Sequence, residues 1–435
     1  MIGPTVGKMA DVWGHRRVWR TGVLLEIAQC VAASGTGTIA FLLAVRPLAG
    51  VAMACGSAGY AIMCRDLPAA QRGRVSAWQE STGTSGGSFG LAVSGLMVDR
   101  WGWRSVFVAP MAPLLAMGLA SLCVIQTDPV PAARRSQRGG KGATFDTAGA
   151  VVLALATGSL LLLLNRGNSS GWTSPLVLGL AVAVALLVPG LVAIEQKAAA
   201  PILPAYIFRS RARTVTMLVA CVSSFNWQAV AFVTSVFLQE AKGLSPSDVG
   251  LLLFVRPGAG FLTSLCMTRY LGRRDRAPRA LARLVQRAAA VSTLSLCLLL
   301  AAGEADMTRA PGRALITCSQ VISAVGGVII QVTAGAIIAG SAKEDGLANA
   351  MATFNSLRSV TQNLGVSLLM AIVHAGGVEG SVAAYRPAWL LVIVLQELTV
   401  PLAGLMAGSG GGGQGERAGE REALRGTAAE DSAVD

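Results

Sequence analysis

Charged residues are scarce in this sequence. They make up 14% of the 435 residues, whereas hydrophobic residues make up 53% and the mean hydropathy is +0.58. Such a composition leaves too little polar surface to cover a water-soluble globule. Aromatic residues are also few, at 5%, and the apolar segments are continuous rather than alternating, which excludes a transmembrane β-barrel. The sequence therefore predicts an all-α integral membrane protein.

Residues and motifs that bind metal ions or phosphate are also few. The chain has two histidines, and its eight cysteines include no CxxC pair, so we expect no metal site and no disulfide framework. Gly139-Gly140-Lys141 lacks the upstream glycine spacing of a phosphate-binding loop. We therefore expect no cofactor and no enzymatic activity, and an ion gradient rather than ATP as the energy source.

Apolar segments of bilayer length recur along the chain. A helix of about 20 residues crosses the roughly 30 Å of hydrocarbon. This criterion predicts spans at 18–37, 39–63, 76–97, 105–125, 147–165, 174–194, 213–236, 246–267, 285–302, 313–340, 350–374 and 387–407.

Basic residues are not spread evenly. The formal net charge is +13, and arginine and lysine gather in alternate loops between the predicted spans. The positive-inside rule places these loops in the cytoplasm of a multi-pass protein of the cell membrane. No basic-aromatic groove accompanies them, so we expect a lipid bilayer rather than nucleic acid as partner. The cytoplasmic set is Lys8, Arg16, Arg17, Arg65, Arg72, Arg74, Arg134, Arg135, Arg138, Lys141, Lys197, Arg209, Arg211, Arg269, Arg273, Arg274, Arg276, Arg279 and Arg283.

The first motif covers residues 7–17, GKMADVWGHRR. Its glycines permit a tight turn, its aspartate can cap a helix or pair with a cation, and its arginines suit a cytoplasmic interface. The pattern resembles the loop between the second and third helices of the major facilitator superfamily, which serves there as a latch between two halves. Val12 and His15 replace residues that are usually basic. The matching residues are Gly7, Lys8, Asp11, Gly14, Arg16 and Arg17.

A second motif, Arg46-Pro47-Leu48-Ala49-Gly50, lies inside the second predicted span. It resembles the R-x-x-Q-G pattern of the family's fourth helix, which implies a buried arginine linked to proton movement, although Ala49 replaces the usual glutamine. A cation at membrane depth costs about 2.5–3.5 kcal/mol and normally faces a polar cavity or an acidic partner. Alternatively, Arg46 extends to the outer surface. Glu26 and Glu397 are the other proton-coupling candidates because they are carboxylates inside predicted spans.

A third motif carries small residues through the third predicted span and is followed by Gly102-Trp103-Arg104. Small residues at this spacing allow two helices to approach closely. The segment resembles the antiporter motif of the family's fifth helix, with Leu91 in place of the proline that would kink it. The motif positions are Gly86, Gly90, Ser94 and Gly95.

The centre of the chain identifies the branch of the family. Phe145-Asp146, Gly171-Trp172 and the segment 201–209 resemble the 14-helix drug:H+ antiporter family, in which two extra helices join two six-helix halves. The resemblance implies an N-terminal half at 1–125, a linking region at 126–212 and a C-terminal half at 213–407. It also implies that the first helix and nearly all of the second lie upstream of Met1. The glycine-rich segment 408–435 is expected to be a disordered cytoplasmic tail.

Polar residues inside the C-terminal spans are the expected lining of a substrate cavity. Trp227 and Phe225 beside them suit an apolar, amphipathic substrate, although contact with lipid explains these aromatics nearly as well. The cavity candidates are Asn226, Gln228, Arg256, Gln320 and Gln331.

We therefore predict a proton-coupled exporter of hydrophobic, cationic or antibiotic-like small molecules that works by alternating access. Its partners would be the small-molecule substrate, protons and the bilayer. The oligomeric state is not predicted by the sequence. Two alternatives stay open. One is a facilitator or importer of metabolites with the same fold, and the other is a truncated paralogue that does not transport.

Overall fold

The computed structural model describes residues 3–64, 67, 72–125, 147–197, 208, 210–271, 278–305, 309–341, 347–376 and 382–408. This part of the chain forms helices and no β-strand. The helices are α1 (Gly3–Trp13), α2 (His15–Ser34), α3 (Ile39–Met63), α4 (Arg72–Trp101), α5 (Ser105–Val108), α6 (Met111–Val124), α8 (Thr147–Ser170), α9 (Pro175–Lys197), α11 (Arg211–Glu240), α12 (Pro246–Leu271), α13 (Pro278–Ala302), α14 (Ala310–Ser341), α15 (Leu347–Ala375) and α16 (Val382–Gly408).

Each predicted span coincides with helix, although α5 and α6 divide the segment predicted at 105–125. Within the described ranges, nine helical segments are long and apolar enough to cross a membrane. The predicted spans at α2, α4 and α15 do not meet that criterion, because polar residues interrupt their apolar sequence. The predicted tail beyond Gly408 and the whole segment 126–146 between two predicted spans lie outside the described residues.

The first motif is mostly helical, which corrects the prediction of a loop at 7–17. Residues up to Trp13 belong to α1, and α2 begins at His15, so Gly14 alone separates the two helices. Gly14 has φ of +104°, a conformation that side chains disfavour. The turn needs only this one residue because glycine can reverse the chain direction there.

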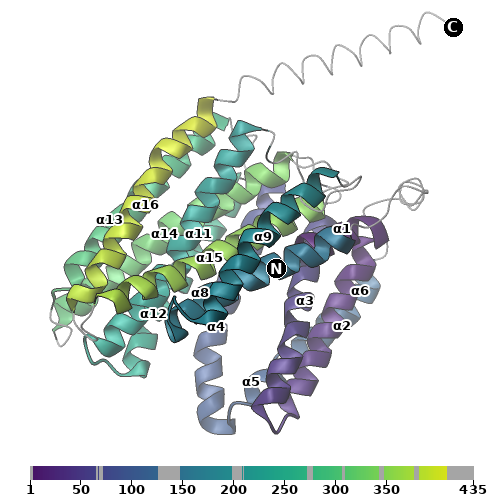
Figure 1. The fold of residues 1–435 in the computed structure, drawn as a ribbon, viewed down its shortest axis with the longest axis horizontal. Coiled ribbons are helices and arrows are strands. Elements are labelled where there is room, and N and C mark those ends of the chain that lie inside the picture. The colour runs from purple at the N-terminus through teal and green to yellow at the C-terminus, as the bar shows by residue number, and fades with distance from the viewer. Residues whose placement is uncertain are drawn as a thin grey trace, which may run out of the picture.

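The helices form two groups with contacts between them (Figure 1). Helices α2, α3 and α6 lie on one side of the molecule, and α11 to α16 form a bundle on the other. Helices α1 and α3 pack against α15, while α4 packs mainly against α12 and α14. Helices α8 and α9 pair with each other, and α8 contacts α15. We refer to α1–α6 as the N-terminal half and to α11–α16 as the C-terminal half.

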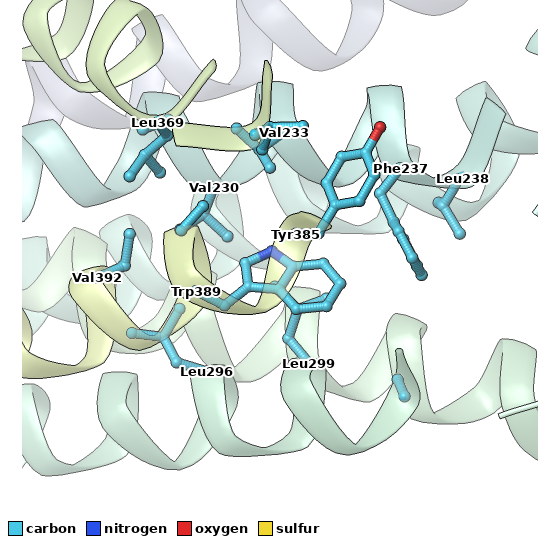
Figure 2. Close-up of a cluster of buried hydrophobic side chains, with 14 of the residues drawn as sticks. Val230, Val233, Phe237, Leu238, Leu296, Leu299, Leu369, Tyr385, Trp389 and Val392 are labelled. Carbon is cyan, nitrogen blue, oxygen red and sulfur yellow. The ribbon is translucent and has the colours of Figure 1, made fainter. Parts of the chain in front are cut away.

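An aromatic cluster forms the largest buried core, inside the C-terminal half (Figure 2). Phe237 lies edge-on to Tyr385 and to Trp389, with ring centroids 5.2 and 4.9 Å apart. All three side chains are completely or almost completely buried. Gly303 makes room for the indole, since a Cβ there would lie 2.9 Å from Cζ3 of Trp389. These contacts join α11, α13 and α16.

The close contact predicted at the third motif is not present at its first two glycines. Gly86 and Gly90 of α4 are exposed, and an added Cβ would meet no atom of the described residues within 4 Å. The prediction is wrong there because α4 directs other faces toward α12 and α14. The side chain of Ser94 and the surroundings of Gly95 lie outside the described part.

The close helix approach is found instead at Gly326 of α14. A Cβ at this position would lie 2.7 Å from the carbonyl oxygen of Ala288 on α13, closer than atoms normally approach. The backbone of α13 cannot move away cheaply, because α13 also packs against α16. Gly326 therefore sets the distance between α13 and α14.

Gly326→Ala is expected to lower the free energy of unfolding by about 1–3 kcal/mol through overpacking. Gly86→Ala is the matched control, since the same methyl group meets no atom of the described residues within 4 Å and raises helix propensity by up to about 1 kcal/mol. Unfolding of the two variants in detergent micelles, followed by circular dichroism, measures the difference. Equal midpoints for both variants would contradict this account of the α13–α14 contact.

Candidate functional site

An ion pair joins the two halves inside the helical region. Nη1 of Arg358 on α15 lies 3.5 Å from Oε2 of Glu80 on α4, and the side chains are 14% and 24% exposed. Nε of Arg358 donates a hydrogen bond to Oγ of Ser224 on α11, at 3.2 Å. The guanidinium also lies 5.3 Å from the ring centroid of Phe354. Among the described residues, Arg358 is therefore held by one charged contact across the halves and two neutral contacts within its own half.

The hydrogen bonds continue from Ser224 to α14. Nε2 of Gln331 donates to Oγ of Ser224 at 2.7 Å and to the carbonyl oxygen of Ala220 at 3.3 Å. Ser224 is completely buried and accepts from both Gln331 and Arg358. This network, Glu80, Arg358, Ser224 and Gln331, connects α4 with three helices of the C-terminal half. We call it the bridging network.

A second arginine, Arg256 of α12, is buried and has only neutral partners in the described part of the chain. Nη2 donates to the carbonyl oxygen of Trp227 at 2.7 Å, and Nη1 lies 3.4 Å from Oε1 of Gln320. The guanidinium carbon is 4.1 Å from the Trp227 ring centroid. Arg256 is 4% exposed, and its Nε has no hydrogen-bond partner among the described residues.

A small polar cavity lies beside Trp227. Its volume of about 20 Å³ is enough for about one water molecule. Nδ2 of Asn226 donates to Oε1 of Gln396 across it at 2.6 Å, and Nε2 of Gln396 donates to Thr399. The cavity is lined by Ser223, Asn226, Trp227, Val230, Ser292, Leu296, Ser323, Gly327 and Gln396.

The predicted proton-coupling residues lie in different surroundings. Glu26 is half-buried, with Oε1 3.5 Å from Nε2 of Gln29 and with no hydrogen-bond partner for Oε2 among the described residues. Arg46 is exposed and lies 5.8 Å from the ring centroid of Phe107. Both residues act electrostatically on the Cys30 thiol, so α2 and α3 bring them to one region.

Glu397 does not have the burial that the sequence predicts. Its side chain is exposed, whereas the adjacent Gln396 is 2% exposed and lines the cavity. Successive side chains of a helix point about 100° apart, so one residue can face the interior while the next faces outward. Gln228 is also exposed, on the face of α11 opposite its buried neighbours. Asn226, Arg256, Gln320 and Gln331 are buried as expected.

The first motif lies beside the N-terminal end of α2. Gly7 and Gly14 are buried, Lys8 and Arg16 are half-buried and Arg17 is exposed, while the side chain of Asp11 lies outside the described part. His15, which replaces a usual arginine, is completely buried. The motif therefore presents one fully exposed cation at its described positions.

Sequence reasoning missed Glu80 and Arg358, although a signal for them was present. Both charges fall inside predicted spans, at 76–97 and 350–374, where an ionised side chain normally needs a partner. Gln396 was missed because a more conspicuous carboxylate follows it. Among the described residues, no group of histidine, cysteine and carboxylate side chains could hold a metal ion. The contacts described at the site are an ion pair, cation–π contacts and hydrogen bonds.

Comparisons with known proteins agree with this architecture. Residues 1–366 match the model of the Major Facilitator Superfamily. The chain is 27% identical over 269 residues to multidrug resistance protein Stp of Mycobacterium tuberculosis (strain CDC 1551 / Oshkosh), covering 61% of this chain and 48% of Stp. It is 28% identical over 256 residues to the tetracenomycin C resistance and export protein of Streptomyces glaucescens, covering 58% and 46%. The chain spans about half the length of these relatives.

The fold is also similar to a solved structure. The crystal structure of the human organic anion transporter MFSD10 superposes with a TM-score of 0.62 at 14% identity, covering 93% of this chain and 80% of that one. At this identity the likeness concerns the fold. The predicted all-α membrane fold of two helical bundles is thereby confirmed.

Proposed function

This chain belongs to the Major Facilitator Superfamily, and from that premise we propose that it is a proton-coupled secondary transporter that exports drug-like or antibiotic small molecules by alternating access. The observation that carries the proposal is the ion pair between Glu80 and Arg358. It joins helices of opposite halves and contains a carboxylate that can take up a proton. Alternating access requires that contacts between the halves break and form again in each cycle.

Protonation of Glu80 removes the charge that holds Arg358 across the two halves. The neutral acid keeps at most a hydrogen bond, which is weaker than a charge-assisted one. Arg358 then retains Ser224 and Phe354, both of which belong to the C-terminal half. The ion pair can therefore break while the guanidinium keeps its contacts with Ser224 and Phe354. Proton uptake by Glu80 is thereby linked to loss of the contact between α4 and α15.

Arg46 and Glu26 are the proposed proton-handling residues of the N-terminal half. They lie near the same thiol, and Oε2 of Glu26 has no hydrogen-bond partner in the described part. The exposed Glu397 has no comparable surroundings. We further propose that the first motif contacts the cytoplasmic ends of the halves and that the tail beyond Gly408 is cytoplasmic, as the distribution of arginine and lysine predicts.

The names of the relatives support drug-like or antibiotic substrates. Stp is named for multidrug resistance, and the Streptomyces glaucescens relative for resistance to and export of tetracenomycin C. Facilitated diffusion of a metabolite is the alternative mechanism. It would move substrate without releasing protons.

Proton release from inverted membrane vesicles tests the proposal. Vesicles are acidified inside, and tetracenomycin C or ethidium is added while an entrapped pH dye is recorded. We expect the drug to dissipate the gradient, and Glu80→Gln to slow this at least tenfold at equal abundance in the membrane. Glu304→Gln is the matched control, because Glu304 pairs with the exposed Arg386 within one half.

Two results would contradict the proposal. Drug equilibration without any proton release would indicate a facilitator. Full proton release in Glu80→Gln would show that the Glu80 carboxylate takes no part in proton coupling. Arg46→Ala and Glu397→Gln, assayed in parallel, separate the N-terminal candidates from the bridging network.

A further inference from the structure

The interior of the C-terminal half contains a positive charge with no carboxylate beside it among the described residues. Arg256 is 4% exposed in the middle of α12, and its described contacts are one carbonyl, one amide oxygen and one aromatic face. An arginine at bilayer depth is costly unless it is paired or reaches water. Nε adds a donor without an acceptor in the described part.

The half-buried Arg358 shows what is missing. Arg358 has the Glu80 carboxylate at 3.5 Å in addition to its neutral contacts. At Arg256 the side-chain oxygen that accepts from the guanidinium belongs to Gln320, an amide of almost the same shape as glutamate. The cation–π contact with Trp227 contributes about 2 kcal/mol when desolvated, which offsets only part of the cost of the buried charge.

The surroundings of Arg256 connect it to the polar cavity. Trp227 contacts the guanidinium and also lines the cavity. Gln320, Ser323 and Gly327 are spaced by three and four residues on α14, so they lie on one face of that helix. Gln320 contacts the arginine, and the other two line the cavity. A polar strip on α14 therefore leads from the cavity to the buried charge.

A proline lies beside Arg256 in α12. Pro257 follows this arginine and cannot donate a hydrogen bond to the carbonyl of Leu253. Prolines within helices are sites at which helices bend. A bend here would separate α12 from α14 at the arginine.

We propose that Arg256 is the recognition site for an organic anion: the carboxylate or phenolate of a substrate with an aromatic or apolar body. The planar guanidinium binds carboxylate through two parallel hydrogen bonds, one of them from the free Nε. The Trp227 ring supplies the apolar surface beside it. This inference rests on the proposed function and specifies the substrate class, which differs from the cationic class predicted by the sequence.

Thermal unfolding of the purified chain in detergent tests the site with two probes of the same shape. Benzoate carries the anion, and benzamide is its neutral isostere. We expect benzoate, but not benzamide, to raise the unfolding midpoint of the native chain. Arg256→Gln should weaken the apparent benzoate affinity at least tenfold. Arg287→Gln, which removes an exposed arginine of α13, should leave it unchanged.

A second variant covers the case in which Arg256→Gln does not fold. Gln320→Glu places a carboxylate next to the guanidinium, so it should raise the unfolding midpoint without ligand and abolish the benzoate effect. Retention of benzoate binding in Gln320→Glu or in Arg256→Gln would overturn the proposal. So would the absence of a benzoate effect in the native chain, or an equal effect of chloride at the same concentration.

The two experiments distinguish failure of the anion site from failure of the proposed function. Drug-dependent proton release with no benzoate effect would reject the anion site alone. Arg256-dependent benzoate binding without proton release from the vesicles would reject proton coupling and leave the site.

Discussion

Arg358→Gln is expected to lower the free energy of unfolding by about 2 kcal/mol, between the costs of breaking an exposed and a buried ion pair. The variant removes the cation that lies 3.5 Å from the Glu80 carboxylate, which is only 24% exposed. It also removes the donor to Ser224, although Gln331 still donates to that hydroxyl. The loss should therefore come mainly from the broken ion pair.

The double variant Glu80→Gln/Arg358→Gln is expected to recover most of that stability, since neither charge then remains. Arg386→Gln breaks an exposed ion pair with Glu304 and should cost about 0.5 kcal/mol. Unfolding in mixed micelles with increasing sodium dodecyl sulfate gives the three free energies. A double variant as unstable as Arg358→Gln would show that the bridge acts through something other than charge.

Trp389→Ala is expected to cost about 3–5 kcal/mol through the cavity it leaves. The indole is completely buried in the cluster that contains Phe237 and Leu299 (Figure 2). A Cβ at Gly303 would lie 2.9 Å from its Cζ3 atom. Within a bilayer the loss comes from missing van der Waals contacts, because lipid is as apolar as the core. Trp101→Ala, at a 68% exposed position of α4, should change stability by less than about 1 kcal/mol.

Trp389→Phe separates ring volume from hydrogen bonding. Nε1 of Trp389 has no hydrogen-bond partner in the described part of the chain, so phenylalanine should retain most of the stability. The same micelle titration measures all three variants. A loss in Trp389→Phe as large as in Trp389→Ala would mean that the indole nitrogen has a role that packing does not explain.

The sequence predicted the helices well because bilayer thickness fixes their length. The segment 39–63 coincides with α3, whose start is set by Thr38, which accepts a hydrogen bond from the amide of Phe41. Gly14 was recognised as a turn residue, but the helical state of the residues before it was not. Charged residues such as Lys8 made that segment look like a loop.

The site was predicted less completely, because the rotation of each helix is poorly determined by its sequence. A helix that is apolar all round gives no amphipathic signal. In α16 the inner residue is therefore Gln396 and not Glu397. The sequence also does not show which charged residues form ion pairs, since Glu80 meets Arg358 only when α4 packs beside the C-terminal half. Arg256 was found because a single cation inside an apolar run is conspicuous without a partner.

The uneven burial of the helices has a mechanical consequence. Buried residues make up 61% of the most apolar stretch of both α11 and α14, against 11% in α3 and 6% in α5–α6, within the described part of the chain. The α5–α6 segment has few contacts with the other described helices and would leave a bilayer almost alone, whereas α3 would take α2 with it. Helices α11 and α14 cannot leave without separating from several neighbours. Force applied to the protein would thus meet a small resistance at α5–α6 and a large, concerted one in the C-terminal bundle.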